Sequence, residues 1–529
     1  MKGDSMKQKC KSLLSCLLVF VLLVCIVAPA GAVGRTSIPT VYVMGYGAAI
    51  YAVAGDTSTE LYYPVQIPAD LMDTLKNDLP PLMLKGIAGN WTDFHTYMTD
   101  LTLSVTGQVA LDNNGEASNG SGIACTTNPV SPNPGQTSFE KDAYHFEYDW
   151  RLDPLYTAQL LNSYIEDVKT ATGYSKVNLI GRCYGNNVLL AYLYAYGYDS
   201  LARVVFYSPD FYGFDFANAL FSGNLGIEAD ELEGYFTESG RELFSSMDEE
   251  SYESLMKAIR FLNSGVLLNM GSFALNGYFV PEFQRYILPE VLRGSFGTCP
   301  SMWSFINDDN FEKAKKYVFG GYEDEFAGLI KKIDSYHYNV QIKAADLING
   351  LVEREIPVYI ICKYGMNQIP LSTDEGLNGD ALANVYSGSF GATAAPLGKQ
   401  LSKCYIKKQE EANGGKYLEP DRGVDASTCL LPDHTWFMRG VYHSTNPDSV
   451  ELLIEKLLNY DGWMTVFDDP AYPQFMQYNK QTGEITPQVA GVMTPTGAQH
   501  GFLMTQIKAV MHLINKLIIK IRNWVESMR

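Results

Sequence analysis

The segment at residues 176–197 constrains the fold of this chain more than any other. It begins with a short apolar run, Val-Asn-Leu-Ile, typical of a buried strand, and ends with an apolar helical stretch closed by a glycine. Between the two, Gly181 and Gly185 flank Cys183 in the pattern Gly-Arg-Cys-Tyr-Gly. Strand, tight turn and helix are the context of a nucleophile elbow, which usually reads Gly-x-Ser-x-Gly. In this chain the central residue is cysteine.

The two glycines have a steric role in such a turn. A side chain at Gly181 or Gly185 would collide with the neighbouring strand or helix. The turn would present Cys183 at a helix N-terminus, where the partial positive charge favours a thiolate. The alternative is a structural turn that holds an unreactive buried cysteine, because a five-residue pattern is short.

The N-terminal segment at 1–32 has the pattern of a secretory signal peptide. Four lysines lie at or before position 11, an apolar run follows at 13–27, and Ala-Gly-Ala at 30–32 fits a small-x-small cleavage site. We therefore expect a secreted or otherwise extracytoplasmic protein. The alternative is a protein anchored to the membrane through a retained N-terminus, although the apolar run is short for a membrane span.

Composition narrows the classes of function. The chain has 529 residues, 46% of them hydrophobic and 19% charged, which is a globular composition. Its formal net charge of −19 argues against nucleic acid as a partner. The sequence contains no phosphate-binding loop, no His-Glu-x-x-His and no Cys-x-x-Cys, so we expect neither a cofactor nor a metal.

Six cysteines lie beyond the signal segment, at positions 125, 183, 299, 362, 404 and 429. An exported protein can form disulfides. Cys404 and Cys429 could form a bridge, but spacing alone does not determine connectivity. Cys362 lies in an apolar strand, so we expect it to be a buried thiol.

Strand and helix patterns alternate over residues 38–207, which predicts a mainly parallel sheet. The strand at 40–44 continues into Gly-Tyr-Gly-Ala at 45–48. In an elbow-type enzyme, the loop after an early strand supplies one amide of the oxyanion hole. We therefore expect the backbone amides of Tyr46 and Tyr184 to form this hole, the alternative for 45–48 being an ordinary glycine turn.

The order of several motifs resembles one family. After the Gly-Tyr-Gly strand come Tyr-Asp-Trp-Arg at 148–151, a helix, the elbow, Cys-Pro-Ser at 299–301 and a strand at 358–362. This order resembles the lecithin:cholesterol acyltransferase (LCAT)-like family of α/β-hydrolases over residues 38–460. The resemblance implies an α/β-hydrolase fold, a mainly parallel sheet flanked by helices, and an acyl-ester substrate, in particular a lipid. The chain departs from the family at Cys183, where the family generally carries serine.

This resemblance suggests a division of the chain. Residues 33–210 and 351–460 would form the α/β core, and the helical segment 211–350 would be an inserted cap or lid. The alternative for the insertion is a purely structural helical subdomain. Residues 461–529 would form a C-terminal extension that includes an amphipathic helix at 506–528.

The fold places an acid and then a histidine after the nucleophile. Asp421 resembles the Asp of the family's Asp-Gly-x-Val loop, with Asp425 as the runner-up. His443 is the expected base because it lies in the loop before the last core helix, whereas His434 lies earlier and His500 lies in the tail. The alternative for each is a solvated carboxylate or a surface histidine.

The predicted C-terminal helix has apolar residues at alternating spacings of three and four from Ile507 to Met528, with lysines and arginine on its other sides. Such a basic amphipathic helix could dock on the protein, pair as a coiled coil or contact a membrane surface.

The expected function is therefore that of an exported LCAT-like acyltransferase, lipase or esterase with Cys183, His443 and Asp421 as a catalytic triad. Acyl transfer would pass through a thioester on Cys183, and the acceptor would be water or an alcohol. One alternative is a cysteine acyltransferase similar to polyester synthases, which work inside cells on CoA thioesters; the signal peptide argues against this. The other is a non-catalytic lipid- or ligand-binding protein with a relic elbow.

Overall fold

The computed structural model of the chain describes residues 38–66, 68, 71–132, 143–225, 233–243, 247–263, 280–371 and 377–491. The predicted signal peptide at 1–32 and the predicted amphipathic helix at 506–528 lie outside these ranges and stay predictions. Of the helices in the described ranges, none is long and apolar enough to cross a membrane.

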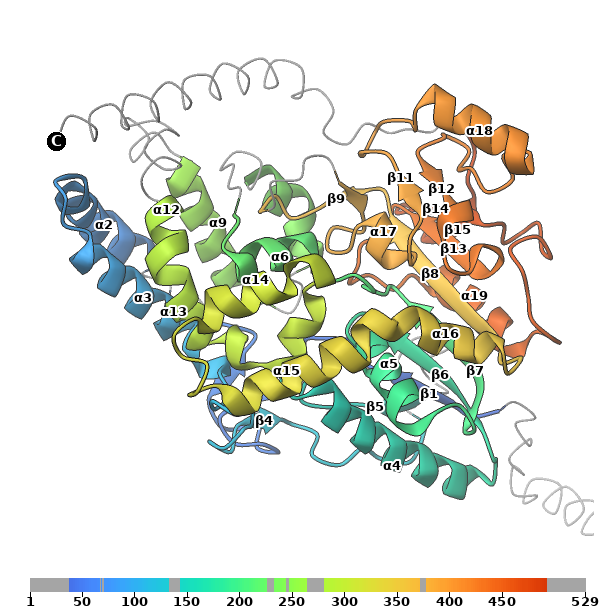
Figure 1. The fold of residues 1–529 in the computed structure, drawn as a ribbon, viewed down its shortest axis with the longest axis horizontal. Helices are drawn as coiled ribbons and strands as arrows, with labels where there is room; N and C mark the ends of the chain where they lie inside the picture. Colours follow the sequence, from blue (N-terminus) through green and yellow to red (C-terminus); the bar gives the residue numbers. More distant parts are fainter. Residues whose placement is uncertain are drawn as a thin grey trace, which may run out of the picture.

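An eight-stranded sheet forms the centre of the fold, with the strand order β15-β14-β13-β8-β7-β6-β1-β5 (Figure 1). Its strands are β1 (Thr40–Val43), β5 (Tyr144–Phe146), β6 (Val177–Arg182), β7 (Leu201–Tyr207), β8 (Val358–Tyr364), β13 (Thr435–Arg439), β14 (Phe475–Asn479) and β15 (Glu484–Pro487). All neighbouring strands pair in parallel except β14 and β15, which are antiparallel. Every residue of β8 is buried, as expected for a parallel strand covered on both faces. The prediction of an α/β fold with a mainly parallel sheet is confirmed.

Helices cover both faces of the sheet. One face carries α4 (Pro154–Thr172), α5 (Gly185–Tyr196) and α16 (Ala344–Val352), and the other carries α19 (Asp448–Asn459). The alternation along β1 shows the two faces directly. Val41 and Val43 pack in the cluster that includes α4 and α5, whereas Tyr42 between them packs in the cluster that includes α19. Such a two-sided arrangement is compatible with an α/β-hydrolase fold.

The insertion between β7 and β8 is mainly helical. Its helices include α6 (Asp215–Ser222), α8 (Arg241–Leu243), α9 (Glu249–Asn263), α12 (Val280–Glu282), α13 (Leu288–Arg293), α14 (Asp308–Phe319) and α15 (Ala327–Asn339). Part of this insertion packs against α2 (Leu71–Ile87) and α3 (Thr92–Thr106), which precede the elbow in the chain (Figure 1). Leu79, Phe94 and Ile287 share one buried cluster there. The helical part of the molecule is therefore built from two separate stretches of sequence.

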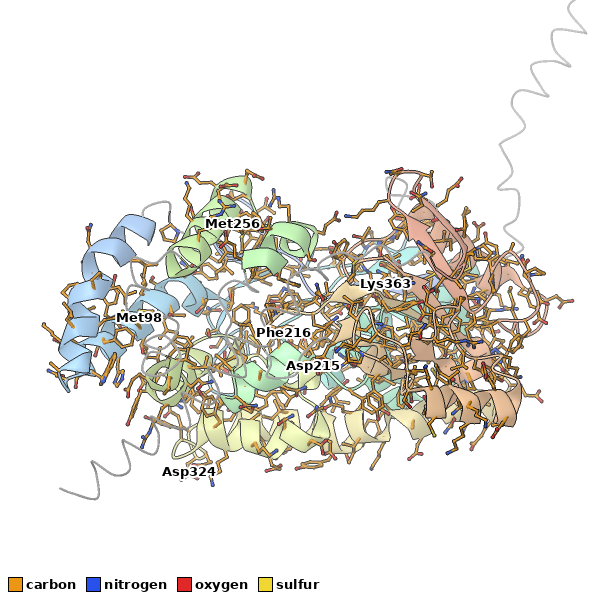
Figure 2. The ribbon with its side chains drawn as sticks, turned by 90° about the horizontal axis from the view of Figure 1, so that it is seen from above. Met98, Asp215, Phe216, Met256, Asp324 and Lys363 are labelled. Atoms are coloured by element: carbon orange, nitrogen blue, oxygen red, sulfur yellow. The ribbon has the colours of Figure 1, made fainter. Side chains whose placement is uncertain are left out.

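Helices α2, α3 and α9 lie toward one end of the molecule and the central sheet toward the other, whereas α16 at the end of the insertion covers the sheet (Figure 1). Met98 of α3 and Met256 of α9 lie toward one end, and Lys363 of β8 lies toward the other (Figure 2). Asp215 and Phe216, at the start of α6, lie between them (Figure 2). The insertion thus begins where the carboxyl end of β7 meets the helical part.

The C-terminal region differs from its predicted role as an extension after residue 460. β14 and β15 are strands of the central sheet, and β14 pairs with β13 through Phe437 opposite Phe475. Phe475 and Met476 are buried there. These strands escaped the sequence interpretation because each is short and lies in a stretch with little periodicity.

Smaller elements complete the described chain. They are the sheet of β2 (Ile50–Tyr51), β3 (Leu61–Tyr63) and β4 (Gly122–Ile123), the pairs β9 (Met366–Asn367) with β10 (Asn378–Gly379) and β11 (Thr393–Ala394) with β12 (Val424–Asp425), and the helices α17 (Val385–Gly388) and α18 (Lys403–Asn413).

The cysteines form no disulfide in the described chain. Cys404 lies exposed on α18, whereas Cys429 is buried in the same cluster as Cys362, so the suggested bridge between Cys404 and Cys429 is not formed. Cys362 is fully buried in β8, as expected.

Candidate active site

The turn between β6 and α5 has the geometry of a nucleophile elbow. Cys183 has a φ of 51°, a left-handed conformation that non-glycine residues adopt rarely. A Cβ on Gly181 would lie 2.7 Å from Oδ1 of Asn186, and one on Gly185 would lie 2.4 Å from the carbonyl oxygen of Val43. The steric role predicted for both glycines is confirmed.

Hydrogen bonds hold this turn in its strained shape. The amide of Cys183 donates to the carbonyl of Tyr207 in β7 at 3.2 Å. The side-chain amide of Asn186 donates to the carbonyls of Cys183 at 2.9 Å and Tyr207 at 3.0 Å. The nucleophile strand, the turn and the next strand are thereby tied together.

His443 lies in the loop between β13 and α19 and is 3% exposed. Its Nδ1 lies 2.7 Å from Oδ2 of Asp380, and its backbone amide donates to the carbonyl of Asp380 at 2.9 Å. The other carboxylate oxygen of Asp380 accepts the amides of Leu382 at 3.1 Å and Ala383 at 2.7 Å. With its carboxylate held in this way, Asp380 accepts a hydrogen bond from Nδ1–H of His443, which leaves Nε2 to act as acid or base.

Cys183 also interacts with His443 and affects the pKa of its imidazole. Burial by itself lowers the pKa of His443, but the carboxylate of Asp380 and the sulfur of Cys183 both raise it, to about 10. Nε2 of His443 is buried and makes no hydrogen bond of good geometry within the described residues. Long contacts of this kind are common in active sites without substrate. A protonated His443 opposite Cys183 is the arrangement that stabilises a thiolate.

The acid partner of the histidine differs from the predicted one. Asp421 instead pairs with Nη1 of Arg439 at 2.6 Å and accepts the amide of Gly491 at 2.7 Å. Its role is to tie β13 to the chain that follows β15. Asp421 was predicted as the acid because its loop resembles a family pattern, but its carboxylate contacts Arg439 and Gly491 instead of His443.

The runner-up acid is also committed elsewhere. Asp425 accepts a hydrogen bond from the hydroxyl of Tyr405 at 2.8 Å and from the amide of Ser427 at 2.9 Å. It caps a short helical turn after β12 and is fully buried.

A positional signal for Asp380 was present in the sequence. The residue belongs to Asn-Gly-Asp at 378–380, the first such turn after β8, and β8 is two strands from the elbow strand in the sheet. Sites in open parallel sheets gather at the carboxyl ends of strands. The glycine- and serine-rich composition of the surrounding stretch concealed this turn.

A second buried carboxyl group, Asp210, was also missed by the sequence interpretation. It follows β7 and is 1% exposed, with the side-chain amide of Asn187 at 3.2 and 3.3 Å from its two oxygens. Burial raises the pKa of Asp210 to about 7, while His443 lowers it and Asp380 adds to the rise. The segments that follow the four neighbouring strands β6, β7, β8 and β13 therefore each contribute one ionisable side chain at the carboxyl ends of these strands. These side chains are, in the same order, those of Cys183, Asp210, Asp380 and His443.

The loop at 45–48 passes directly beside the nucleophile. A Cβ on Gly45 would lie 3.0 Å from Cβ of Cys183. The next residue, Tyr46, has its ring 4.2 Å from the ring of Trp150 and 5.5 Å from that of Tyr63. Tyr184, the residue after Cys183, is the N-cap of α5.

The amides of Tyr46 and Tyr184 donate no hydrogen bond to other residues of the described chain. The predicted pair of oxyanion-hole donors is therefore next to Cys183 and uncommitted.

Aromatic side chains surround the ionisable groups. Phe214 meets the ring of His443 edge-on at 5.7 Å and stacks on Phe305 at 4.7 Å. On the side of Tyr46, Trp150 stacks with Phe296 at 6.4 Å. The surroundings of the site are thus apolar, which suits an apolar acyl group. Within the described ranges, no cluster of His, Cys, Asp and Glu could hold a metal ion.

The protein therefore has an α/β fold, with a cysteine, a histidine and an aspartate near the carboxyl ends of the strands of its central sheet. No known protein-family model matches the sequence, and no curated protein matches it. The resemblance to the LCAT-like family stays a prediction from its motifs.

Proposed function

We propose that this protein is a thiol-dependent α/β-hydrolase that acts on acyl esters through a thioester on Cys183. The observation that carries the proposal is the position of Cys183, on a turn with φ 51°, beside a His443–Asp380 pair joined at 2.7 Å. Strained backbone of this kind persists mainly at functional sites, because the surrounding structure must hold it in place.

The proposed first step forms the thioester. The Cys183 thiolate attacks the ester carbonyl carbon, and the amides of Tyr46 and Tyr184 donate to the developing oxyanion. When the tetrahedral intermediate collapses, the alcohol leaves and takes the Nε2 proton of His443. Asp380 keeps the imidazole in the required tautomer and stabilises its protonated form.

The second step reverses these roles. Neutral His443 takes a proton from water or an acceptor alcohol, whose oxygen attacks the thioester. Cys183 leaves as a thiolate opposite the reformed imidazolium. Water gives hydrolysis, as in a lipase or esterase, and an alcohol gives O-acyl transfer.

The substrate class follows from the site's surroundings and the family resemblance. The rings of Phe214 and Trp150 near the ionisable groups favour apolar acyl chains. The LCAT-like motifs extend this to lipid esters in an extracytoplasmic setting. The helices of 211–350 would act as a lid, and residues 506–528 would contact a membrane surface.

Turnover of chromogenic esters of increasing chain length tests the proposal, with and without an acceptor alcohol. Cys183→Ala should lower kcat/KM by a factor on the order of 10⁴, and Cys183→Ser should be impaired because serine has no readily ionised form. Cys404→Ala, which removes an exposed thiol far along the chain, should leave turnover unchanged. A mass increase of one acyl group on Cys183 that hydroxylamine removes would identify the thioester.

Two results would count against the proposal. Full turnover after stoichiometric alkylation of Cys183 would remove this residue from the chemistry. Failure to turn over any ester, despite a folded protein, would favour the non-catalytic binding protein.

A further inference from the structure

Two basic side chains beside the site have no part in the proposed chemistry. Lys363 of β8 is 1% exposed, and Arg182, the last residue of β6, is partly buried next to Cys183. Within the described residues, neither side chain forms a salt bridge with a carboxylate. A buried basic group without such a partner is costly, so its position calls for a specific reason.

Both side chains donate hydrogen bonds to one short loop. Nζ of Lys363 donates to the carbonyls of His443 at 2.9 Å and Thr445 at 2.8 Å. Nη2 of Arg182 donates to the carbonyl of Ser444 at 2.5 Å. Three consecutive carbonyls of the histidine loop are therefore held by side chains from two different strands.

The loop also has contacts on its other side, where the hydroxyl of Ser444 donates to the carbonyl of Glu242 at 2.7 Å and that of Thr445 donates to Oε2 of Glu242 at 3.4 Å. It has no regular secondary structure, and its backbone bonds include those from the amide of His443 to Asp380 and from the amide of Thr445 to Tyr442. The carbonyl bonds fix the loop from the side of the sheet, whereas Asp380 fixes the His443 ring from the opposite loop.

The hydrogen bonds from Arg182 and Lys363 to the three loop carbonyls are called the carbonyl clamp here. The part made by Lys363 does not require a charged amine. Burial lowers the pKa of Lys363 well below its ordinary value, and Arg182 lowers it further, whereas Asp380 and Cys183 act in the opposite direction. A neutral amine still has two hydrogens, enough for both carbonyls. The ring of Tyr207, 4.4 Å from Nζ, fills the remaining side.

We propose that Arg182 and Lys363 are positioning residues, which hold the His443 loop by its carbonyls so that Nε2 stays aimed at Cys183. This inference rests on the proposed function, because it assigns the two side chains to the same nucleophile and base. It predicts that loosening the loop weakens the support that His443 gives to a thiolate on Cys183.

The test compares alkylation of two thiols in the same molecule. Iodoacetamide reacts with the thiolate, and peptide mass spectrometry gives the rate at Cys183 relative to that at Cys404, an exposed free thiol. The ionisable groups that interact with Cys183 or His443 are Asp380, Asp210, Arg182, Lys363, Tyr46 and Tyr148, and Cys183 and His443 also interact with each other. Rates are measured at pH 6 and pH 9, because an ordinary thiol, with a pKa of about 8.5, is almost wholly protonated at the lower pH and largely ionised at the higher one.

Lys363→Met and Arg182→Met should each lower the rate ratio at pH 6 by about tenfold and change it less than threefold at pH 9. Hydrogen exchange at 443–446 should become faster in both variants. The matched control is Arg203→Met, because Arg203 of β7 is also partly buried and its Nη2 donates to a loop carbonyl, that of Tyr460, at 2.8 Å. This control should leave the ratio at both pH values unchanged.

Folding is checked by melting temperature, and the milder Arg182→Lys, with a shorter reach to Ser444, should give a smaller loss of the same kind. An unchanged ratio at pH 6 in folded variants would overturn the inference, as would an equal loss at both pH values. If Cys183 of the unaltered protein reacts no faster than Cys404 at pH 6, the proposed function fails instead.

Discussion

Cys183 illustrates how one residue carries both strain and reactivity. Its left-handed backbone, with φ 51°, costs about 1–3 kcal/mol for a residue with a Cβ. The hydrogen bond from the Cys183 amide to the carbonyl of Tyr207 and the two hydrogen bonds donated by the Asn186 side chain offset this cost, because they hold the turn in this conformation. The same geometry places the sulfur beside His443 and the loop at 45–48.

The assignment of Asp380 as the acid leads to a direct prediction. Asp380→Asn should lower kcat/KM by about 10²–10⁴, because an amide neither fixes the tautomer of the neutral His443 imidazole nor stabilises its protonated form. Asp421→Asn should stay within a few-fold of the unaltered enzyme, since Asp421 bonds Arg439 instead. Steady-state kinetics on one chromogenic ester would measure both, and the reverse ranking would restore Asp421 as the acid.

Asp210 should make stability depend on pH. Burial raises its pKa to about 7 in the folded protein, against about 3.9 in an unfolded chain. The native state therefore binds more protons at Asp210 between these values, so the contribution of Asp210 to stability is fully present below about pH 4 and is lost as the pH rises through about 7. Asp210→Asn should flatten the fall in melting temperature between pH 5 and pH 7.

His443 has the same sign but a later window. Because its pKa is raised from 6.5 to about 10, its contribution to stability is lost mainly above pH 6.5. Burial lowers the pKa of His434, which acts with the opposite sign just below pH 6.5, so Asp210 is isolated by the difference in slope between the unaltered protein and Asp210→Asn. An unchanged slope in Asp210→Asn would mean that this carboxyl group is ionised throughout.

At the level of elements, the β6–α5 unit depends on how closely it approaches β1. The first turn of α5 lies against the backbone after β1, where a Cβ on Gly185 would meet the carbonyl oxygens of Val43 at 2.4 Å and Met44 at 2.7 Å. Backbone atoms at the end of a strand that is paired on both sides, as β1 is with β5 and β6, have little freedom to move aside. Helix placement and nucleophile presentation are therefore coupled at one glycine.

Gly185→Ala should accordingly destabilise the protein by about 1–3 kcal/mol or more, the range found for overpacking. Gly234→Ala is the matched control, because a Cβ there meets nothing within 4 Å, and alanine should be neutral or slightly stabilising in a helix. Urea unfolding would measure both. Equal stabilities of the two variants would contradict the close approach at β1.

At the level of the whole molecule, the C-terminal strands close the sheet beyond β13. Gln488 and Glu419 both bond the hydroxyl of Tyr364 in β8 at 2.7 Å. Asp421 accepts the amide of Gly491 and pairs with Arg439 of β13. Residues after 460 are thus bound into the core by buried polar contacts as well as by strand pairing.

Two truncations should separate the roles of this region. A chain ending at 460 should fail to fold stably, because it leaves the β14 side of β13 unpaired and exposes buried side chains. A chain ending at 506 should keep its melting temperature and lose association with liposomes, if the predicted helix contacts a membrane. Unchanged liposome association would leave docking or pairing as the role of residues 506–528.

The sequence by itself determined the local features of this protein. The elbow at 181–185 was recognisable because its steric demands fall within five residues, where glycine is the only tolerated side chain at two of them. The alternation of strands and helices indicated a parallel sheet for the same reason, since period and propensity are short-range properties. His443 was found from its place before the last core helix.

Only the tertiary structure decided which distant residues meet. Asp380, Asp421 and Asp425 all follow β8 in the chain, and the choice among them depends on which segment folds back to His443. The carbonyl clamp of Arg182 and Lys363, the joining of β14 to β13, and the packing of α3 on α13 are likewise long-range. No local pattern encodes such contacts, because they arise when the chain closes loops of tens to hundreds of residues.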